Sequence, residues 1–312
     1  MAKKLISIVT PCYQEEGNIG LLIDTLRDIM SKYADKYDYE QIIIDNASTD
    51  NTVAICKAQA AQHKNIKLIV NARNFGHVRS SYYGFIQAMG DAVIVLASDF
   101  QDPPELIPQF IEKWESGYRM VLGIKNQSEE GWFFNKVRKF YYSFSKKLSD
   151  VQLIKNFTGF GLYDKLAMDT FRKFDDPYPY FRGMVSEIGF EKAFINFNQP
   201  NRKRGFSKNN FYTLYDVAML GITGNSKIPL RLATFLGFAM SAISLIITLV
   251  YLVLKLCFWY SFSAGMAPIV IGIFFFASVQ LFFIGILGEY IGAIHTQLQR
   301  RPMVVELERV NF

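Results

Sequence analysis

The residues best suited to chemistry lie in one short acidic segment, residues 97–105, which reads Ala-Ser-Asp-Phe-Gln-Asp-Pro-Pro-Glu. It follows an apolar run, residues 92–96, that predicts a buried strand. Carboxylates just beyond a strand lie where open α/β sheets bind their ligands. The side-chain oxygens of Asp99, Gln101 and Asp102 are hard donors suited to Mg²⁺ or Mn²⁺ bridging a diphosphate. The segment is equally typical of an acidic cap on a helix that the proline pair begins.

Polar residues also follow three other expected strands, at residues 11–16, 45–46 and 73–77. The carboxyl ends of parallel strands share one edge of a sheet, so these residues and the acidic segment are expected to lie together. These segments supply the phenol of Tyr13 for stacking, and carboxylates for hydrogen bonds to a base or a ribose. The chain has no phosphate-binding glycine motif of the Rossmann or P-loop kind, which argues against a dinucleotide or ATP. Each residue alone is typical of a turn or a cap, and only their combination indicates a nucleotide diphosphate.

The elements that position these residues alternate between strand and helix. Apolar runs predict strands over residues 5–10, 41–44, 66–70 and 92–96. Helical spacing and capping residues predict helices over residues 19–30, 48–62 and 80–89. That order predicts an α/β domain with a doubly wound, mostly parallel sheet.

The composition changes sharply near residue 230. Residues 232–254 carry no charge, and a helix of that length is roughly 34 Å long, enough to cross a bilayer. A second uncharged stretch follows Lys255, and its interruption around residues 260–268 places the second span at 267–287. A buried pair of globular helices is the alternative, and the length of both stretches argues against it.

The charges that flank the two spans indicate their orientation. Arg231 precedes the first span, Arg300 and Arg301 follow the second, and the link between the spans has no Lys or Arg. The positive-inside rule then predicts a multi-pass protein of the cell membrane, with the N-terminal domain and both termini in the cytoplasm. The N-terminus has no signal-peptide core. Gln280 suits a hydrogen bond between membrane helices, which allows a homo-oligomer.

The excess of basic residues is small, with 34 Lys and Arg against 28 Asp and Glu, and gives no argument for nucleic acid. The cations cluster late, at Arg202, Arg204 and Lys208, beside residues 211–223, whose spacing predicts an amphipathic helix. That helix fits a membrane surface or the face of the soluble domain, and the cation cluster fits a phosphate or anionic lipid headgroups. The three cysteines have no disulfide or zinc spacing.

Together these motifs resemble the family 2 (GT-A) glycosyltransferases, in particular the polyprenyl-phosphate glycosyltransferases and the relatives of dolichol-phosphate mannose synthase. The resemblance is carried by the two spans and by residues 10–16, 45–50, 73–76, 101–105, 182–183, 207–208 and 287–292. It implies four parts. They are a cytoplasmic GT-A domain over residues 1–210, an interface helix and link over 211–229, a transmembrane hairpin over 230–294 and a cytoplasmic tail over 295–312.

The resemblance also implies roles for individual residues. The nucleotide would be held by Pro11, Tyr13, Glu15, Asp45, Asn46 and Arg73. The metal, Mg²⁺ or Mn²⁺, would be held by Asp99 and Gln101. The diphosphate or the acceptor phosphate would meet Arg182, Arg202, Arg204 and Lys208. Asp99, Asp102 and Glu187 are the catalytic candidates.

The implied reaction is the transfer of one sugar from a nucleotide-sugar, with UDP favoured, to a polyprenyl phosphate at the cytoplasmic membrane face for cell-surface glycans. One in-line displacement would invert the anomeric carbon, because no carboxylate pair is placed for a covalent intermediate. A second hypothesis keeps the donor and uses a sugar hydroxyl on a lipid diphosphate as the acceptor. A third is a membrane-anchored pseudoenzyme that scaffolds glycan assembly. Two spans with so few polar residues argue against a transporter.

The sequence departs from the family pattern at three places. Ala97 stands where the family has the first Asp of its Asp-Ala-Asp motif, and Asn46 replaces the second of two acids after the second strand. Gly159 and Gly161 occupy the positions of the family's mid-chain Asp and Arg. A lipid phosphate is already ionised and needs no general base, so the missing acid weighs most against a hydroxyl acceptor. Glu187, on an expected helix of the acceptor side, is the carboxylate that could take its place.

Overall fold

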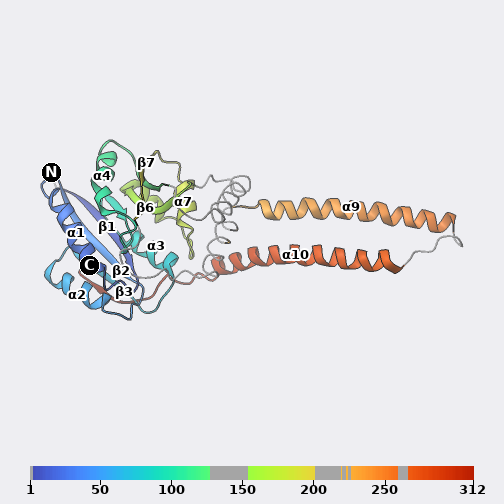
Figure 1. Ribbon diagram of the computed structural model, residues 1–312, viewed down its shortest axis with the longest axis horizontal. Helices are drawn as coiled ribbons and strands as arrows, with labels where there is room; N and C mark the ends of the chain where they lie inside the picture. The colour runs from blue at the N-terminus through green and yellow to red at the C-terminus, as the bar shows by residue number, and fades with distance from the viewer. Residues whose placement is uncertain (1–2, 127–153, 201–218, 220–222, 224–225, 259–265) are drawn as a thin grey trace.

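The protein consists of an α/β domain and two long helices that extend away from it (Figure 1). The computed structural model describes residues 3–126, 154–200, 219, 223, 226–258 and 266–312. The predicted interface helix and the cations Arg202, Arg204 and Lys208 lie outside these described residues, apart from positions 219 and 223 of the helix.

The domain is built on a sheet whose described strands have the order β7-β5-β6-β4-β1-β2-β3-β8. The strands are β1 (Lys4–Cys12), β2 (Tyr37–Asp45), β3 (Ile66–Asn71), β4 (Ala92–Val95), β5 (Met120–Lys125), β6 (Phe157–Asp164), β7 (Lys192–Phe197) and β8 (Glu306–Val310). Strands β4, β1, β2 and β3 are parallel neighbours, as are β5 and β7. Strand β6 is antiparallel to β4 and β5, and β8 is antiparallel to β3. The predicted α/β domain with a mostly parallel sheet is confirmed.

Helices cover both faces of the sheet. One face packs against α1 (Ile19–Ser31), α2 (Thr52–Gln62), the short 3₁₀ turn η1 (Pro104–Leu106) and α4 (Ile107–Glu115). The other packs against α3 (His77–Gln87), α6 (Lys165–Phe171) and α7 (Phe181–Glu187). Because side chains alternate along a strand, Ile8 of β1 packs on the first face and its neighbour Val9 on the second.

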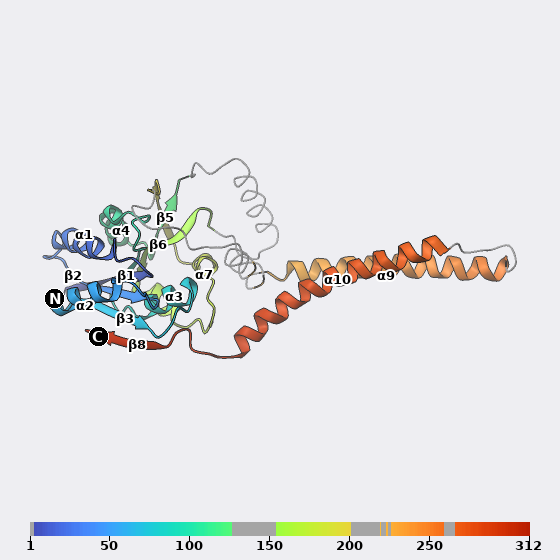
Figure 2. The same cartoon turned by 60° about the horizontal axis from the view of Figure 1, so that its bottom comes forward.

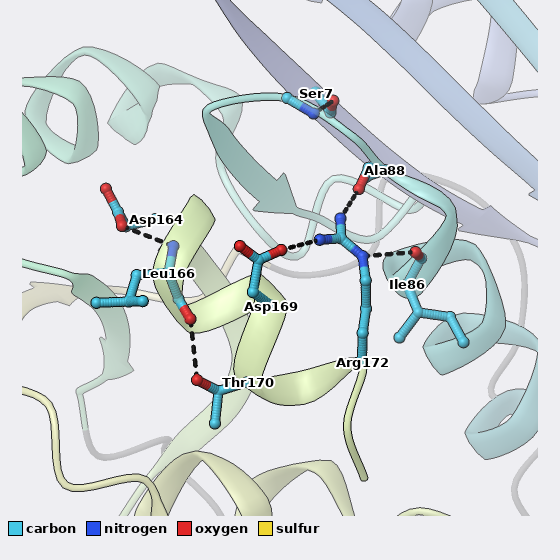
Figure 3. A network of polar contacts seen from close by, with 9 residues as sticks. Ser7, Ile86, Ala88, Asp164, Leu166, Asp169, Thr170 and Arg172 are labelled. Atoms are coloured by element: carbon cyan, nitrogen blue, oxygen red, sulfur yellow. Dashed lines mark hydrogen bonds and ion pairs between the residues drawn. The ribbon is translucent and has the colours of Figure 1, made fainter. Parts of the chain in front are cut away.

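Arg172, just beyond α6, ties the second helical layer together (Figure 3). Its guanidinium donates to the carbonyls of Ile86 and Ala88 at the end of α3, and to Asp169 at 2.7 Å. A cation at a helix C-terminus satisfies carbonyls that have no partner inside the helix. The hydrogen bonds to Ile86 and Ala88 hold the C-terminal end of α3 in place. The N-terminal end of the same helix faces the candidate site.

The two long helices are α9 (Ile228–Cys257) and α10 (Met266–Leu298). Both are long and apolar enough to cross a membrane: within Ile228–Cys257 and Ile271–Leu298, an 18-residue stretch has a mean hydropathy of 2.3 and 2.2 respectively, and neither stretch is buried in the protein. The two helices therefore agree with the predicted spans, and each extends past the predicted boundaries. The hydroxyl of Tyr290 on α10 donates to the carbonyl of Ser226, just before α9, at 2.6 Å.

The segment after α10 returns to the soluble domain and forms β8 beside β3 (Figure 2). Sequence patterns predicted only a tail over residues 295–312. The amide of Asn311 donates to the carbonyls of Ala60 at 2.7 Å and Ile66 at 2.8 Å, and Tyr83 donates to Glu306 at 2.8 Å. The N-terminal domain and the end of the chain therefore share one sheet.

Candidate active site

A cavity of about 300 Å³ opens beside the C-terminal ends of β1 and β4. Its walls come from the end of β1, the first turns of α3, the acidic segment, the start of β6 and the start of α7. The polar side chains in its lining are His77, Ser81, Tyr82, Asp102, Thr158, Tyr180 and Arg182. We call it the main cavity. It brings the predicted acidic segment next to the predicted acceptor-side cation Arg182.

The acidic segment folds back on itself. Asp102 is 8% exposed, and its carboxylate accepts the backbone N–H of Ala97 at 3.0 Å. Asp99 is 6% exposed, and it accepts the N–H of Gln101 at 3.1 Å. Burial raises the pKa of Asp102 to about 7; the bond from Ala97 opposes this rise and the charge of Asp99 adds to it. The two carboxylates are thus held in place, close enough to interact electrostatically.

These contacts separate the two interpretations of the acidic segment. Neither η1 nor α4 has a side-chain hydrogen bond at its N-cap, so the bond to Ala97 shapes the loop and does not cap a helix. Asp99 and Gln101 supply hard oxygens of the kind that Mg²⁺ and Mn²⁺ prefer. No cluster of three or more His, Cys, Asp or Glu able to hold a metal occurs in the part of the chain that the structure describes. A metal held by Asp99 and Gln101 would therefore need its remaining ligands from a bound diphosphate.

The residues predicted to hold a nucleotide lie along the ends of β1, β2 and β3. Pro11 lines the main cavity. The carboxylate of Asp45 accepts the N–H of Ser48 at 2.8 Å, and burial raises its pKa. Glu15 accepts the side-chain amide of Asn18 at 2.6 Å. Their own neighbours therefore fix both acids in position before any ligand arrives.

Asn46 connects the ends of β2 and β3. Its side-chain oxygen accepts the N–H of Phe75 at 2.9 Å and the amide of Asn71 at 3.2 Å. Its side-chain nitrogen donates to the amide oxygen of Asn74 at 2.9 Å. A carboxylate could accept both bonds but could not donate the third. The departure from the family's acid at this position therefore has a local structural reason.

Arg73 does not line the main cavity. Its guanidinium lies over the ring of Phe75, 4.0 Å from the ring centre, and donates to the carbonyl of Asn74 at 3.1 Å. It lines a separate groove together with Arg79 and Arg301. Tyr13 is half-buried at the end of β1 and Gln101 is half-buried in the acidic segment.

The acceptor side of the main cavity contains His77, which the sequence placed at the ligand edge of the sheet without assigning it a role. His77 is the first residue of α3 and lines the cavity with Arg182. Enclosure by the cavity wall, and secondly the charge of Arg182, lower the pKa of His77. The hydroxyl of Thr158 is buried in the same wall and has no partner among the described residues. The sequence signal for His77 was its place in residues 73–77, the polar segment that follows the third expected strand.

Glu187 lies elsewhere. It is the exposed last residue of α7 and lines a second cavity of about 160 Å³ between the soluble domain and α10. Asp176 and Thr296 line this second cavity too, and Tyr180 lines both cavities. The structure therefore does not bring Glu187 to Asp102, although the two cavities share a wall.

The two glycine departures have backbone explanations. Gly159 has a φ of +111°, a conformation that side-chain-bearing residues rarely adopt. A Cβ at Gly161 would lie 2.5 Å from the carbonyl oxygen of Val121 on β5, which leaves no room for a side chain. The close pairing of β5 with β6 at this point excludes an arginine at position 161.

Comparison with known proteins identifies the family. Residues 7–175 match the model of glycosyl transferase family 2. A Bacillus subtilis protein named uncharacterized glycosyltransferase YkcC is 31% identical over 300 residues, covering 96% of this chain and 92% of that protein. The bactoprenol glucosyl transferase of Shigella phage SfV is 31% identical over 301 residues, which cover 96% of this chain and 97% of that protein.

Among solved structures, glucosyl-3-phosphoglycerate synthase from Mycobacterium tuberculosis, in complex with Mn²⁺ and UDP-glucose, is 16% identical with a TM-score of 0.44. The aligned region covers 70% of this chain and 77% of the synthase chain. The family match covers more than half of this chain, and the two relatives match it over almost its whole length. The chain belongs to glycosyl transferase family 2 and is a glycosyltransferase.

Proposed function

We propose that this glycosyltransferase moves one sugar from a nucleotide-sugar, with UDP as the favoured nucleotide, to a polyprenyl phosphate at the cytoplasmic face of the cell membrane. The product would serve the synthesis or modification of cell-surface glycans. One observation carries the proposal: the main cavity joins the acidic segment of the donor side to the cation Arg182 and the imidazole of His77. Relatives named bactoprenol glucosyl transferase, similar over 96% of the chain, support a lipid acceptor.

On the donor side, Asp45, Glu15 and the Asn46 network would present fixed hydrogen-bonding groups to the base and ribose. Asp99 and Gln101 would hold Mg²⁺ or Mn²⁺, which when bound offsets the negative charge of the leaving diphosphate. Asp102 keeps the acidic segment folded through its bond to Ala97 and faces the main cavity. Preorganised groups of this kind need no rearrangement as charge develops, which is how such sites lower a barrier.

On the acceptor side, Arg182 would hold the acceptor phosphate by charge-assisted hydrogen bonds. The hydroxyl of Thr158 is placed to donate to a phosphate or sugar oxygen, because it is buried in the cavity wall without another partner among the described residues. A phosphate is its own nucleophile, so no base is needed where Gly159 replaces the family's acid. A single in-line attack on the anomeric carbon inverts its configuration.

The location at a membrane is supported by the two apolar helices α9 and α10. Strand β8 pairs with β3 in the soluble domain, which supports both ends of the chain lying on one side of the membrane. The excess of cations beside the helices favours the cytoplasm for that side.

The proposal is tested by incubating membranes that contain the protein with a panel of labelled nucleotide-sugars and polyprenyl phosphate. We expect one donor to label the lipid, and the label to be lost in Asp99→Ala. Sealed right-side-out vesicles should protect residues 1–230 from added protease. A folded protein that labels no lipid with any donor would instead support the pseudoenzyme hypothesis.

A hydroxyl acceptor remains a second candidate because Tyr180 lines both the main cavity and the cavity that contains Glu187. A hydroxyl needs a base, so Glu187→Gln should then slow transfer by roughly 10²- to 10⁴-fold. With a lipid phosphate acceptor the same variant should transfer at nearly the wild-type rate. The comparison of both acceptors, alongside a melting curve, decides between the candidates.

A further inference from the structure

The face of helix α3 that lines the main cavity is polar in its first turns and aromatic towards its far end. Its lining residues are His77, Val78, Ser81, Tyr82 and Phe85. These positions recur every three to four residues, so they lie on one side of the helix. His77 and Ser81 are neighbours on that side, one turn apart. The helix therefore presents two polar side chains to the cavity ahead of an aromatic stretch.

Ser81 is half-buried, and its hydroxyl has no hydrogen-bond partner among the described residues. Other hydroxyl side chains in helices behave differently: Thr25, Thr170 and Ser186 each donate to the carbonyl four residues earlier, at 2.8 to 2.9 Å. Such a local bond occupies the donor of the hydroxyl. The hydroxyl of Ser81 is therefore available in the cavity as both a donor and an acceptor.

A second hydroxyl reaches the cavity from the sheet. Thr158, near the start of β6, also lines the cavity, and its hydroxyl is buried without a partner in the described chain. The aromatic wall beside these hydroxyls is closely packed, with Tyr82, Phe85 and Phe160 at most 3% exposed. A few placed polar groups in an otherwise apolar wall are typical of sites that fix the orientation of a small ligand. A pyranose ring, which carries hydroxyls around its rim and C–H groups on its faces, matches such a wall.

The proposed reaction places the transferred sugar against this wall. Its anomeric carbon must lie between the leaving diphosphate, at the acidic segment, and the attacking phosphate, at Arg182. Asp102 of the acidic segment and Arg182 both line the main cavity, together with Ser81. The cavity volume, about 300 Å³, is at the lower end of the usual range for ligand sites, about 300–1,000 Å³. The cavity therefore suits a single sugar residue.

We propose that Ser81 is a specificity-determining residue, whose hydroxyl hydrogen-bonds to one hydroxyl of the transferred hexose. The assignment rests on the proposed function, which puts the hexose in the main cavity. Thr158 would hydrogen-bond to the same ring from β6, and the two hydroxyls together would fix the orientation of the ring. A hexose that lacks the oxygen facing Ser81, or that carries it in the other configuration, would leave Ser81 unpaired. Discrimination among sugars would then come from the wall of α3, away from the residues that hold the nucleotide.

The test measures dissociation constants for the full-length protein in detergent, with Mn²⁺ and without any acceptor, by isothermal titration calorimetry. The ligands are UDP, UDP-glucose, UDP-galactose and UDP-N-acetylglucosamine, followed by the monodeoxy analogues of the tightest-binding UDP-sugar. Ser81→Ala should weaken the binding of that UDP-sugar about fivefold and leave the affinity for UDP unchanged. One monodeoxy analogue should bind the wild type and Ser81→Ala equally, because the hydrogen bond is already absent.

Two further variants serve as controls. Ser81→Thr keeps a hydroxyl and should recover most of the lost affinity. Ser31→Ala removes an exposed serine at the end of α1 and should bind every ligand as the wild type does. Alanine is a better helix former than serine, so Ser81→Ala should melt no lower than the wild type. A loss of sugar affinity in that variant then has a local cause.

Equal weakening of UDP and the UDP-sugar in Ser81→Ala would overturn the proposal, because Ser81 would then act on the nucleotide. Unchanged affinity for every UDP-sugar, or an equal loss with every monodeoxy analogue, would overturn it too. A folded wild type that binds no UDP-sugar would contradict both this assignment and the proposed function. Sugar binding that depends on Ser81, in a protein that labels no lipid, would contradict only the proposed transfer.

Discussion

The proposed donor region, at the ends of β1, β2 and β3, and the proposed acceptor side of the main cavity are built differently. On the donor side Glu15 and Asp45 accept hydrogen bonds from residues three positions further along their own loops, and Asn46 joins the ends of β2 and β3. On the acceptor side Arg182 is exposed and forms no ion pair among the described residues, and the hydroxyl of Thr158 is unsatisfied. Under the proposed assignment, the soluble domain alone preorganises the donor site, while the acceptor itself completes the acceptor site.

The largest expected effect is the loss of Asp99. Asp99→Ala removes the carboxylate of the proposed metal site, and we expect turnover to fall by on the order of 10²-fold or more. Chelation of divalent metal should have a similar effect on the wild type. The matched control is Asp35→Ala, which removes an exposed acid between α1 and β2. Full activity in excess chelator would show that the donor side works without a metal.

The next largest effect tests the acceptor side. Arg182→Gln should reduce kcat/KM for the lipid acceptor by about tenfold to hundredfold, the value of a charge-assisted hydrogen bond. The KM for the nucleotide-sugar should stay unchanged, because the donor residues do not contact Arg182. Arg182→Lys should recover part of the loss. A rise in the donor KM alone would mean that Arg182 belongs to the donor side and that the comparison of the two sides is wrong.

A smaller effect is expected from breaking the hydrogen bonds of Asn46, which join the strand ends of the donor side. Asn46→Asp removes the donor to Asn74 and places a charge at a side chain that is 5% exposed. We expect about 1–3 kcal/mol loss in the free energy of unfolding and a higher donor KM. Asn65→Asp, a half-exposed control, should change neither quantity. An unchanged melting curve for Asn46→Asp would show that the network is not needed.

The smallest expected effect concerns the ion pair between Lys57 and Glu308 on β8, at 2.5 Å. Both side chains are more than 40% exposed, so Glu308→Gln should cost less than about 1 kcal/mol in unfolding free energy. Asn311→Ala should lower the free energy of unfolding by more, because it removes hydrogen bonds to the carbonyls of Ala60 and Ile66. Urea unfolding curves of the two variants compare these contributions directly. A larger loss in Glu308→Gln would reverse this order.

The sequence predicted the parallel strands well because β1 to β4 are buried on both faces and appear as continuous apolar runs. It missed β8 because an edge strand is exposed, and Leu307, Glu308 and Arg309 show no buried alternation. Its pairing with β3 is a tertiary contact across most of the chain, which local patterns do not encode.

The candidate site was predicted unevenly for the same reason. The donor-side residues follow strands, so their neighbourhood could be inferred from strand order. The placement of Glu187 in a second cavity depends on how α7 packs beside α10. The participation of His77 depends on the direction of α3. Neither packing arrangement has a signature in the local sequence.

Strand β8 also sets the order in which the molecule can be assembled. Strand β3 ends at Asn71, and its edge partner begins about 235 residues later, roughly 10 to 50 s of synthesis at ~5–20 residues per second. Both apolar helices must be made before the ribosome reaches Glu306. During that interval the backbone of β3 presents an open edge, which is prone to pairing with other chains. Closure of the sheet therefore requires the start of α9 and the end of α10 to lie on the same side as the soluble domain.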